Sequence, residues 1–558
     1  MSQFHPPPGG ALIRSLWTLS AAACCLFCAN IAIVLVVGSY DVRIGPLHLV
    51  AHEIFKPFLL MGGAFWIAVF LRGLTPQPTY VAALPTWLPR FIPAAIVVAL
   101  FAAAYIPSVS INYSDHGWTL SDVSVGVRSI PDALRLFISP RPDGFYRPLT
   151  FLSLWADYRM FGSALWGYHL QSILLHALNS VLVYVLGREL RFERDSAFWA
   201  ATWFALAAMS FEPVLWPAAR FDLLATAFVL VSIIWFLRYL RDPGGGAAKL
   251  LFSAAAYGLA LTNKESAYCL PLLLTAIVLT GTAWQLDSLD RSKLLRAVFV
   301  FGGLTALMLA VRIAIYNGLG GYPATIYGGV SPHFSFTFKS VTGLLTRVLP
   351  IPLLGLNLSV PFGPVMTCCV VLYVAVIAWV VVQGASLGKP ERALVGLALL
   401  SAVPTLNLVG WVTESMRHSR YLYLPGLWIV MAAAILISRR PFGNVALTVL
   451  VAANLAGVVH NLGAYRAMLG RAHAISHQVA DDAARYRANI VDLASIDDGP
   501  FGTLFFRLEI AGDLRKARPD LCVTPDPCAS GGPALRYDWL PASAGVRVQY
   551  LPEGLPPH

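Results

Sequence analysis

Long apolar stretches recur along most of this chain and alternate with short polar segments. About thirteen of these stretches approach the ~20 residues that an α-helix needs to cross ~30 Å of hydrocarbon. They cover residues 13–38, 49–71, 91–109, 165–187, 196–213, 222–239, 249–263, 267–284, 295–316, 363–384, 392–411, 422–437 and 443–461. The pattern therefore predicts an all-α polytopic membrane protein.

Arginines and lysines between the apolar stretches indicate how the chain is oriented. Short cytoplasmic loops carry an excess of these residues. With the N-terminus in the cytoplasm, the basic clusters at 188–194, 238–249, 291–296 and 439–440 all face that side. The outer face then receives the loop 110–164, the turns "WPAARFD" and "NKES", the segment 317–362, the segment "ESMRHSRYLYLP" and the tail from residue 462.

Composition changes along the chain divide it into three parts. Residues 1–90 are predicted to form an N-terminal membrane hairpin, and residues 91–461 a transmembrane domain with the outer loop 110–164. Residues 462–558 are expected to form an amphipathic helix on the outer surface, followed by a small domain rich in Gly and Pro. There Cys522 and Cys528 either close a disulfide, which an exported compartment permits, or remain two free thiols.

The overall composition fits a membrane protein and excludes one class of partner. Apolar residues make up 57% of the 558 positions and charged residues 12%, whereas soluble proteins are roughly a quarter charged. The net charge of +11 does not indicate nucleic-acid binding, because much of it lies in the predicted cytoplasmic loops.

The first outer loop is predicted to hold a defined shape. In "SIPDALRLF", Ser129 is a helix cap and Asp132 lies near the positive end of the helix. The prolines and glycine of "SPRPDGFYRPL" predict a fixed turn, and "TFLSLWADYRMFG" a second surface helix. A shaped loop at this position is suited to form the roof of a site.

Asp115 and His116, in "SDHG", follow the third predicted span within a few residues. A carboxylate at the boundary between membrane and water can accept a proton from an incoming hydroxyl, which is the role of a general base. The same four residues also have the composition of an ordinary turn. Both interpretations stay open from position alone.

Arg147 is the most distinctive of several arginines in the outer loop, because it lies inside the rigid turn "FYRPL". Guanidinium groups bind phosphate bidentately. The alternative is that the loop arginines only contact anionic lipid headgroups.

Further ionisable and aromatic candidates lie at the predicted outer ends of spans. His169 and His176 are seven residues apart and share one helix face, and packing or function explains them equally well. The others are Arg220 and Asp222 in "RFD", Lys264 and Glu265 in "NKES", and Arg420 and Tyr421 in "RYLYLP". A convergent set of such groups is better evidence for a site than any single member.

These segments resemble the TMTC O-mannosyltransferases and their bacterial relatives, which belong to the GT-C class of membrane glycosyltransferases. The resemblance lies in "YRPLTFLSLWADYRMFGSALWGYHLQSILLH" and in "RFDLLAT", "NKES" and "RYLYLP", in this order, over residues 105–465. It implies a GT-C-like helical bundle and a catalytic carboxylate at Asp115. The tetratricopeptide tail of the animal members is absent.

Two positions depart from the family pattern. His116 stands where members often have a second acidic residue, which leaves open a divalent metal or a different acceptor. Ser419 stands where Glu commonly precedes "RYLYLP", so the role of that acidic group is in doubt.

The resemblance implies that a sugar moves from a polyprenyl-phosphate donor to a protein or envelope-glycan acceptor on the outer face of a bacterial inner membrane. Arg147, Lys264, Arg420 and Arg220 are expected to bind the lipid phosphate, and Asp115 to deprotonate the acceptor. One alternative is a transporter or flippase, which predicts ionisable residues at the midplane and matching broken helices in two halves. Another is a non-catalytic assembly protein.

Overall fold

A computed structural model gives the structure of this 558-residue chain. It describes residues 10–37, 40–44, 47–51, 55–73, 127, 129–141, 144–162, 164–244, 246–286, 290–318, 338–410, 412–493, 496, 510–511, 514, 518, 521–524, 533–540 and 545–551.

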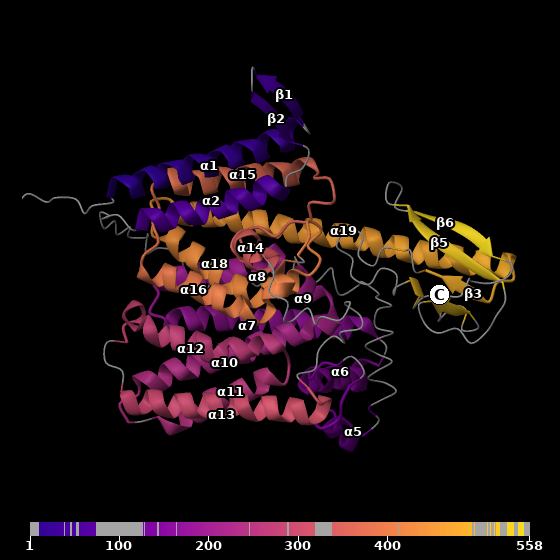
Figure 1. Cartoon of the computed structure of the whole chain (residues 1–558), viewed down its shortest axis with the longest axis horizontal. Helices are drawn as coiled ribbons and strands as arrows, with labels where there is room; N and C mark the ends of the chain where they lie inside the picture. Colours follow the sequence, from indigo (N-terminus) through magenta and orange to yellow (C-terminus); the bar gives the residue numbers. More distant parts are fainter. Residues whose placement is uncertain are drawn as a thin grey trace, which may run out of the picture.

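The described residues form a stack of long helices with a small sheet beyond one end (Figure 1). The helices are α1 (Gly10–Val37), α2 (Phe55–Gly73), α5 (Ile130–Arg135), α6 (Pro148–Phe161), α7 (Leu165–Glu189), α8 (Arg194–Leu206), α9 (Phe211–Leu215), α10 (Arg220–Arg241), α11 (Ala247–Leu261), α12 (Leu270–Leu279), α13 (Arg291–Tyr316), α14 (Phe338–Gly343), α15 (Pro364–Val382), α16 (Lys389–Ala402), α17 (Leu406–Val409), α18 (Tyr423–Ser438) and α19 (Gly443–Arg485).

Two groups of strands accompany the helices. The hairpin of β1 (Tyr40–Ile44) and β2 (Leu47–Ala51) lies beside α1. The other four strands, β3 (Ile490–Asp492), β4 (Cys522–Thr524), β5 (Ala534–Leu540) and β6 (Gly545–Leu551), make a mixed sheet in the order β4-β3-β5-β6. Strand β3 pairs in parallel with β4 and β5, and β5 pairs antiparallel with β6.

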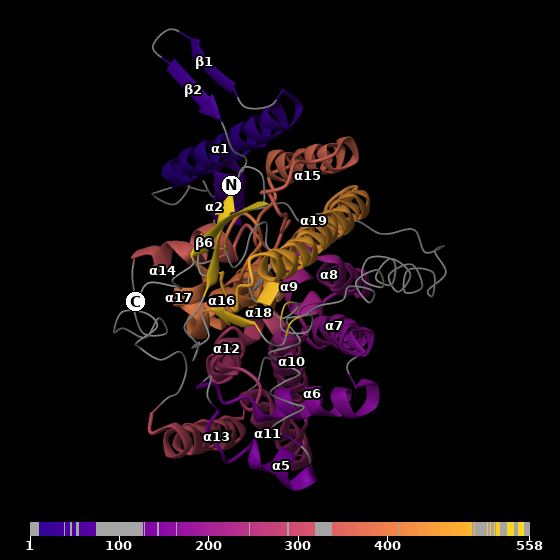
Figure 2. The ribbon, with the colours of Figure 1, turned by 90° about the vertical axis from the view of Figure 1, so that its right-hand side faces the viewer.

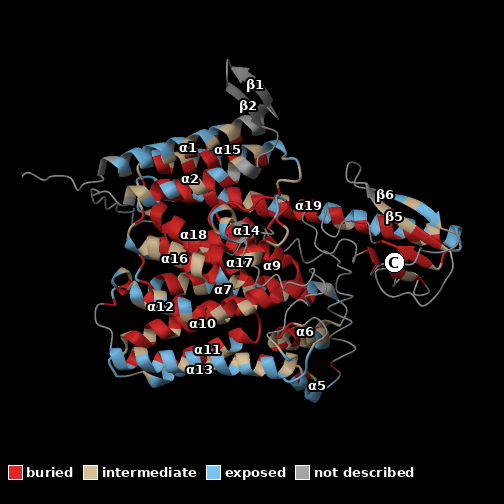
Figure 3. Ribbon diagram, viewed as in Figure 1, coloured by how far each residue is buried: buried red, intermediate tan, exposed pale blue. Residues whose placement is uncertain are grey.

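Burial follows the composition of each helix. The sequence of α18, "YLPGLWIVMAAAILIS", carries no charge, and the span that contains it is 94% buried among its neighbours. Helix α13 is equally apolar but its span is only 11% buried, and side chains such as Phe299 and Leu307 face outward. Figure 3 shows the same contrast between the interior and the outer helices. An apolar outer surface of this kind is suited to lipid.

The prediction of an all-α membrane architecture is confirmed for the bundle. Within the described ranges, 8 helices are long and apolar enough to cross a membrane, or up to 9 if α8 and the bent segment after it count as one span. The predicted spans 249–263 and 267–284 correspond to shorter apolar helices. The predicted span 49–71 is partly wrong, because residues 49–51 belong to strand β2 and the shorter apolar helix begins at Leu59. The span at 91–109 lies outside the described residues, and the total of thirteen stays a prediction.

The segment after the last span differs from the prediction. Residues 462–485 do not form a separate helix on the surface but continue α19, which is 43 residues long and therefore about 65 Å at a rise of ~1.5 Å per residue. Its far half packs against the sheet through Val479, Ala483, Val491, Leu535 and Tyr537. The C-terminal part is thus a small α/β unit carried on the extension of α19 (Figure 1).

A buried non-helical segment, residues 349–358, crosses the interior beside α19. Asn454 donates through Nδ2 to the carbonyl oxygen of Leu353 (3.0 Å), and Asn461 donates to that of Gly355 (3.0 Å). The amide of Asn357 donates to Asn461 Oδ1 (2.8 Å). Irregular backbone is tolerated at membrane depth only where protein satisfies its polar groups in this way.

Candidate functional site

Charged side chains from six segments of the chain form a set of ion pairs. Figure 2 faces the end of the bundle from which α19 emerges. The segments are the turn 144–147 before α6, helix α9, the start of α10, the turn 262–265 after α11, the C-terminal part of α13, and the 3₁₀ turn Ser419–Leu422 before α18. We call the following side chains the charged cluster: Arg147, Glu212, Asp222, Lys264, Glu265, Arg312 and Arg420.

Two arginines share the carboxylate of Glu265. Arg147 Nη2 lies 3.0 Å from Glu265 Oε2, and Arg312 Nη1 lies 3.3 Å from Oε1. The Arg147 guanidinium also lies over two rings, 4.2 Å from the centroid of Phe145 and 4.0 Å from that of Phe221. Stacking on aromatic faces fixes a guanidinium in place and adds attraction to the ring quadrupole.

Lys264 forms a buried ion pair with Asp222, and their side chains are 4% and 6% exposed. Its Nζ lies 5.1 Å from the ring centroid of Phe221 and 5.2 Å from that of Tyr421. Burial lowers the pKa of the Lys264 ammonium, Asp222 opposes this shift, and Arg147 and Arg420 lower the pKa further. The three cations are therefore close enough to act on one another.

Arg420 is held by Glu212. Its side chain forms an ion pair with that carboxylate, and its backbone N–H donates to Glu212 Oε2 at 3.1 Å. Arg420 Nη2 donates to Tyr421 Oη at 3.1 Å, and its guanidinium lies 5.1 Å from the ring centroid of Trp216. Tyr421 thus contacts both Lys264 and Arg420, as Phe221 contacts both Arg147 and Lys264.

Hydrogen bonds fasten the outer loop to the "NKES" turn. The amide of Leu149 donates to the carbonyl oxygen of Thr262 at 3.3 Å, and Thr150 Oγ1 donates to Asn263 Oδ1 at 2.9 Å. Pro148 begins α6 directly after Arg147, where its missing N–H costs nothing. The position of Arg147 relative to Lys264 is therefore fixed by the neighbours of both residues.

The structure brings six of the predicted site residues together: Arg147, Asp222, Lys264, Glu265, Arg420 and Tyr421. Their roles stay predictions. Asp115 and His116 lie outside the described residues.

Arg220 does not take part in these contacts. It forms an ion pair with Asp157 on α6 and donates to the carbonyl oxygen of Tyr168 at 3.0 Å, and both charged side chains are fully buried. Burial raises the pKa of Asp157, and Arg220 opposes that shift. The pair joins α6, α7 and α10, so we interpret Arg220 as structural and do not carry its predicted donor-binding role forward.

The two predicted histidines are fully buried on α7. The ring nitrogens of His176 lie 2.7 Å from Tyr423 Oη and 3.1 Å from the carbonyl oxygen of Ala205, which joins α7, α8 and α18. His169 follows Tyr168, whose carbonyl oxygen accepts from Arg220. These contacts favour packing for His176.

Sequence reasoning missed Glu212 and Arg312. Both fall inside predicted spans, where ionisable residues are costly and often functional. An ionisable residue within an apolar span could therefore have marked each of them as a candidate. Glu212 also lies beside Ser419, whose Oγ donates to Glu212 Oε2 at 3.4 Å. The acidic group near "RYLYLP" comes from α9 instead.

The described residues bear on the divalent metal that the sequence left open. No group of three or more His, Cys, Asp or Glu side chains suited to hold a metal occurs among them. The carboxylates of the charged cluster are instead paired with guanidinium and ammonium groups. The donor set in this part of the chain therefore does not fit a metal.

Comparison with known proteins finds relatives of one kind, although no family model matches the chain. The protein O-mannosyl-transferase Tmtc2 of Drosophila melanogaster is 30% identical over 226 residues, which is 38% of this chain and 23% of that protein. Tmtc1 of the same organism is 28% identical over 188 residues (32% and 21%), and human TMTC2 26% over 212 residues (37% and 25%). The chain thus spans a quarter or less of these relatives.

Among solved structures, ArnT from Cupriavidus metallidurans bound to undecaprenyl phosphate aligns with 80% of this chain and 94% of its own, at 12% identity and a TM-score of 0.29. The sequence resemblance to the TMTC O-mannosyl-transferases, which the ordered motifs indicated, is confirmed by the curated relatives.

Proposed function

We propose that this protein is a membrane glycosyltransferase that moves a sugar from a polyprenyl-phosphate donor to an acceptor. The observation that carries the proposal is the row of three cations, Arg147, Lys264 and Arg420, linked by the rings of Phe221 and Tyr421. The similarity to proteins named protein O-mannosyl-transferases supports the same reaction class.

The charge of the cluster suits the donor. Its four cations and three carboxylates leave a formal charge of +1. A polyprenyl-phosphate sugar is a phosphodiester with one negative charge, so its binding would neutralise the cluster. Cations fixed in a water-poor site also stabilise the charge that develops on a leaving phosphate.

The reaction is a single displacement. Asp115 accepts the proton of the acceptor hydroxyl as its oxygen attacks the anomeric carbon. The bond between that carbon and the phosphate oxygen breaks, and the polyprenyl phosphate leaves with the electron pair, held by Arg147, Lys264 and Arg420. One displacement inverts the anomeric configuration. Protein or envelope glycan is the proposed acceptor class.

The proposed membrane orientation has the charged cluster outside and the N-terminus in the cytoplasm of a bacterial inner membrane. Basic loop residues such as Arg188, Arg241 and Arg439 belong to the opposite ends of their helices, as the excess of positive charge in cytoplasmic loops requires. Cys522 is disulfide-bonded, which an exported compartment permits.

The test is to incubate the purified full chain with a labelled polyprenyl-phosphate sugar and an acceptor extract. We expect the label to move from lipid to acceptor with inversion. Movement of intact donor across the membrane without cleavage would instead identify a transporter. If neither transfer nor movement is observed, the protein is non-catalytic.

Asp115→Asn tests the general base within this assay. We expect transfer to be abolished while donor binding remains. Asp132→Asn is the matched control in the same loop, because Asp132 lies at the start of α5, where its side chain contacts Ser129 and Arg135. Unchanged turnover in Asp115→Asn would remove Asp115 from the catalytic role.

A further inference from the structure

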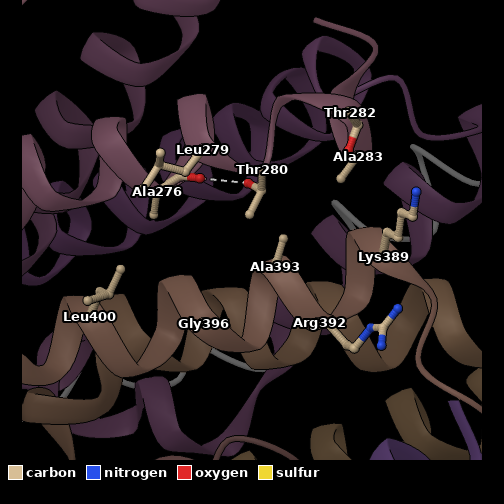
Figure 4. A pocket seen from close by; sticks show the side chains of 10 residues that line it. All are labelled: Ala276, Leu279, Thr280, Thr282, Ala283, Lys389, Arg392, Ala393, Gly396 and Leu400. Atoms are coloured by element: carbon tan, nitrogen blue, oxygen red, sulfur yellow. Dashed lines mark hydrogen bonds between the residues drawn. The ribbon is translucent and has the colours of Figure 1, made fainter. Parts of the chain in front are cut away.

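A hollow lies at the end of the bundle opposite to the charged cluster. It has a volume of about 390 Å³ and is bounded by α12, the 3₁₀ turn Gly281–Trp284 that follows it, and the first three turns of α16 (Figure 4). We call it the α12–α16 groove. None of the residues of the charged cluster lines it.

One end of the groove is cationic. Lys389 and Arg392 line it from the first turns of α16, and Figure 4 shows both side chains toward the same end. Neither has an ion-pair partner among the residues that the structure describes. The acidic residue of this turn, Glu391, does not neutralise them, because its side chain is buried and paired with Arg439.

Apart from Thr280 and Thr282, the other residues that line the groove are apolar, and the groove is open toward the outer surface of the bundle. Its walls include Ala276, Leu279, Gly396 and Leu400. Leu279 is 81% exposed, as a side chain that faces lipid would be. A Cβ added at Gly396 would meet no atom within 4 Å, so the floor of the groove has free space beside α16.

We propose that the α12–α16 groove binds an anionic phospholipid, with its headgroup phosphate on Lys389 and Arg392 and an acyl chain along Gly396 toward Leu400. Two unpaired cations beside an apolar channel match a ligand with a charged head and an apolar chain. The start of the 14-residue helix α16 places a positive helix end on the same side. A soluble phosphate would leave the apolar walls unused.

Bound lipid is expected to stabilise the contact between α12 and α16. Helices α12 and α16 pack directly on one another. The 3₁₀ turn Glu265–Cys269 precedes α12, and its first residue belongs to the charged cluster. In the orientation proposed above, the groove faces the cytoplasmic leaflet. Lipid binding there requires no glycosyl transfer at the other end.

The test uses native mass spectrometry of the purified full chain with phosphatidylglycerol or phosphatidylcholine added in equal amounts. We expect phosphatidylglycerol to bind preferentially. Lys389→Ala and Arg392→Ala should each weaken that binding about fivefold, the equivalent of ~1 kcal/mol per cation at an anionic surface. Arg296→Ala is the matched control, because Arg296 is an exposed arginine near the start of α13 at the same end of the bundle. It should change binding less than about twofold on the same scale.

Gly396→Leu tests the acyl chain separately. A Cβ at this position meets no atom within 4 Å and Gly396 lines the groove, so a leucine is expected to fill the channel. Phosphatidylglycerol binding should then fall while the melting temperature without lipid stays near that of the unmodified protein. Glycerol phosphate, the soluble headgroup, should not displace the lipid.

Three results would overturn the proposal. Phosphatidylglycerol binding that survives loss of both Lys389 and Arg392 would exclude the cationic end. An equal loss in Arg296→Ala would show diffuse attraction to surface charge. Displacement by glycerol phosphate, or full binding in Gly396→Leu, would show that the acyl chain does not occupy the groove.

Discussion

Removing both members of the buried pair between Lys264 and Asp222 is expected to destabilise the protein less than the sum of the two single losses. The side chains are 4% and 6% exposed. Loss of one partner from a buried pair costs about 3–5 kcal/mol, because the remaining charge is left uncompensated. Arg147 and Arg420 still act on the carboxylate of Asp222, so we expect Lys264→Met to lie near the lower value, about 3 kcal/mol.

Asp222→Asn leaves the opposite charge uncompensated, because the ammonium of Lys264 then lies beside Arg147 and Arg420 without its own carboxylate. We expect a loss of about 3–5 kcal/mol. The double variant Lys264→Met/Asp222→Asn removes both charges and should be less destabilised than the sum of the single variants by about 2–3 kcal/mol.

The assay for this cycle is reversible unfolding in mixed detergent micelles, together with binding of polyprenyl phosphate. The double variant should be more stable than the sum of the single losses predicts, whereas lipid-phosphate binding should not return, because the ammonium is absent. Single-variant costs that add within about 0.5 kcal/mol would show that the pair is not coupled. Restored binding in the double variant would show that Lys264 does not hold the phosphate.

Three further changes probe the same cluster. Arg147→Lys keeps the charge but loses the bidentate geometry, so polyprenyl-phosphate affinity in a binding titration should fall about tenfold, and unchanged affinity would contradict the assigned contact. Glu212→Gln keeps an acceptor for the backbone N–H of Arg420 but removes the negative charge that pairs with the Arg420 guanidinium. The value of kcat/KM in the transfer assay should therefore fall about 10- to 30-fold, on the scale of a charged hydrogen bond. An unaltered value would show that Glu212 is not needed to position Arg420. Burial lowers the pKa of Lys264, so its ammonium loses a proton as pH rises, and donor affinity should decline on the alkaline side. In Asp222→Asn this decline should begin at a lower pH, because the carboxylate that raises the pKa of Lys264 is absent. Donor affinity that is constant between pH 7 and about 10 would contradict this.

The apolar pattern predicted the spans well because a helix in lipid must satisfy its own backbone and expose apolar side chains. The stretches 165–187, 222–239 and 422–437 all fall within long helices. The same pattern misplaced the end of α19, because composition changes near residue 461 while the helix continues. A helix needs no change in backbone geometry when it leaves the membrane, so a shift in polarity does not mark its end.

The pairing of β3 with β5 could not be predicted, since it joins segments more than 40 residues apart in sequence. The same limit applied to the site. Grouping by membrane face brought Arg147, Lys264 and Arg420 together as candidates, but the choice of partners depended on packing. Glu212 and Arg312 reach the cluster from segments whose apolar neighbours predicted only membrane spans.

The most direct test of the central claim is an experimental structure with polyprenyl phosphate bound. We predict that the phosphate lies within hydrogen-bond distance, about 3 Å, of the Arg147 guanidinium and the Lys264 ammonium, with Arg420 beside it. A phosphate found away from these three side chains, for example on Lys389 and Arg392 in the α12–α16 groove, would contradict the claim.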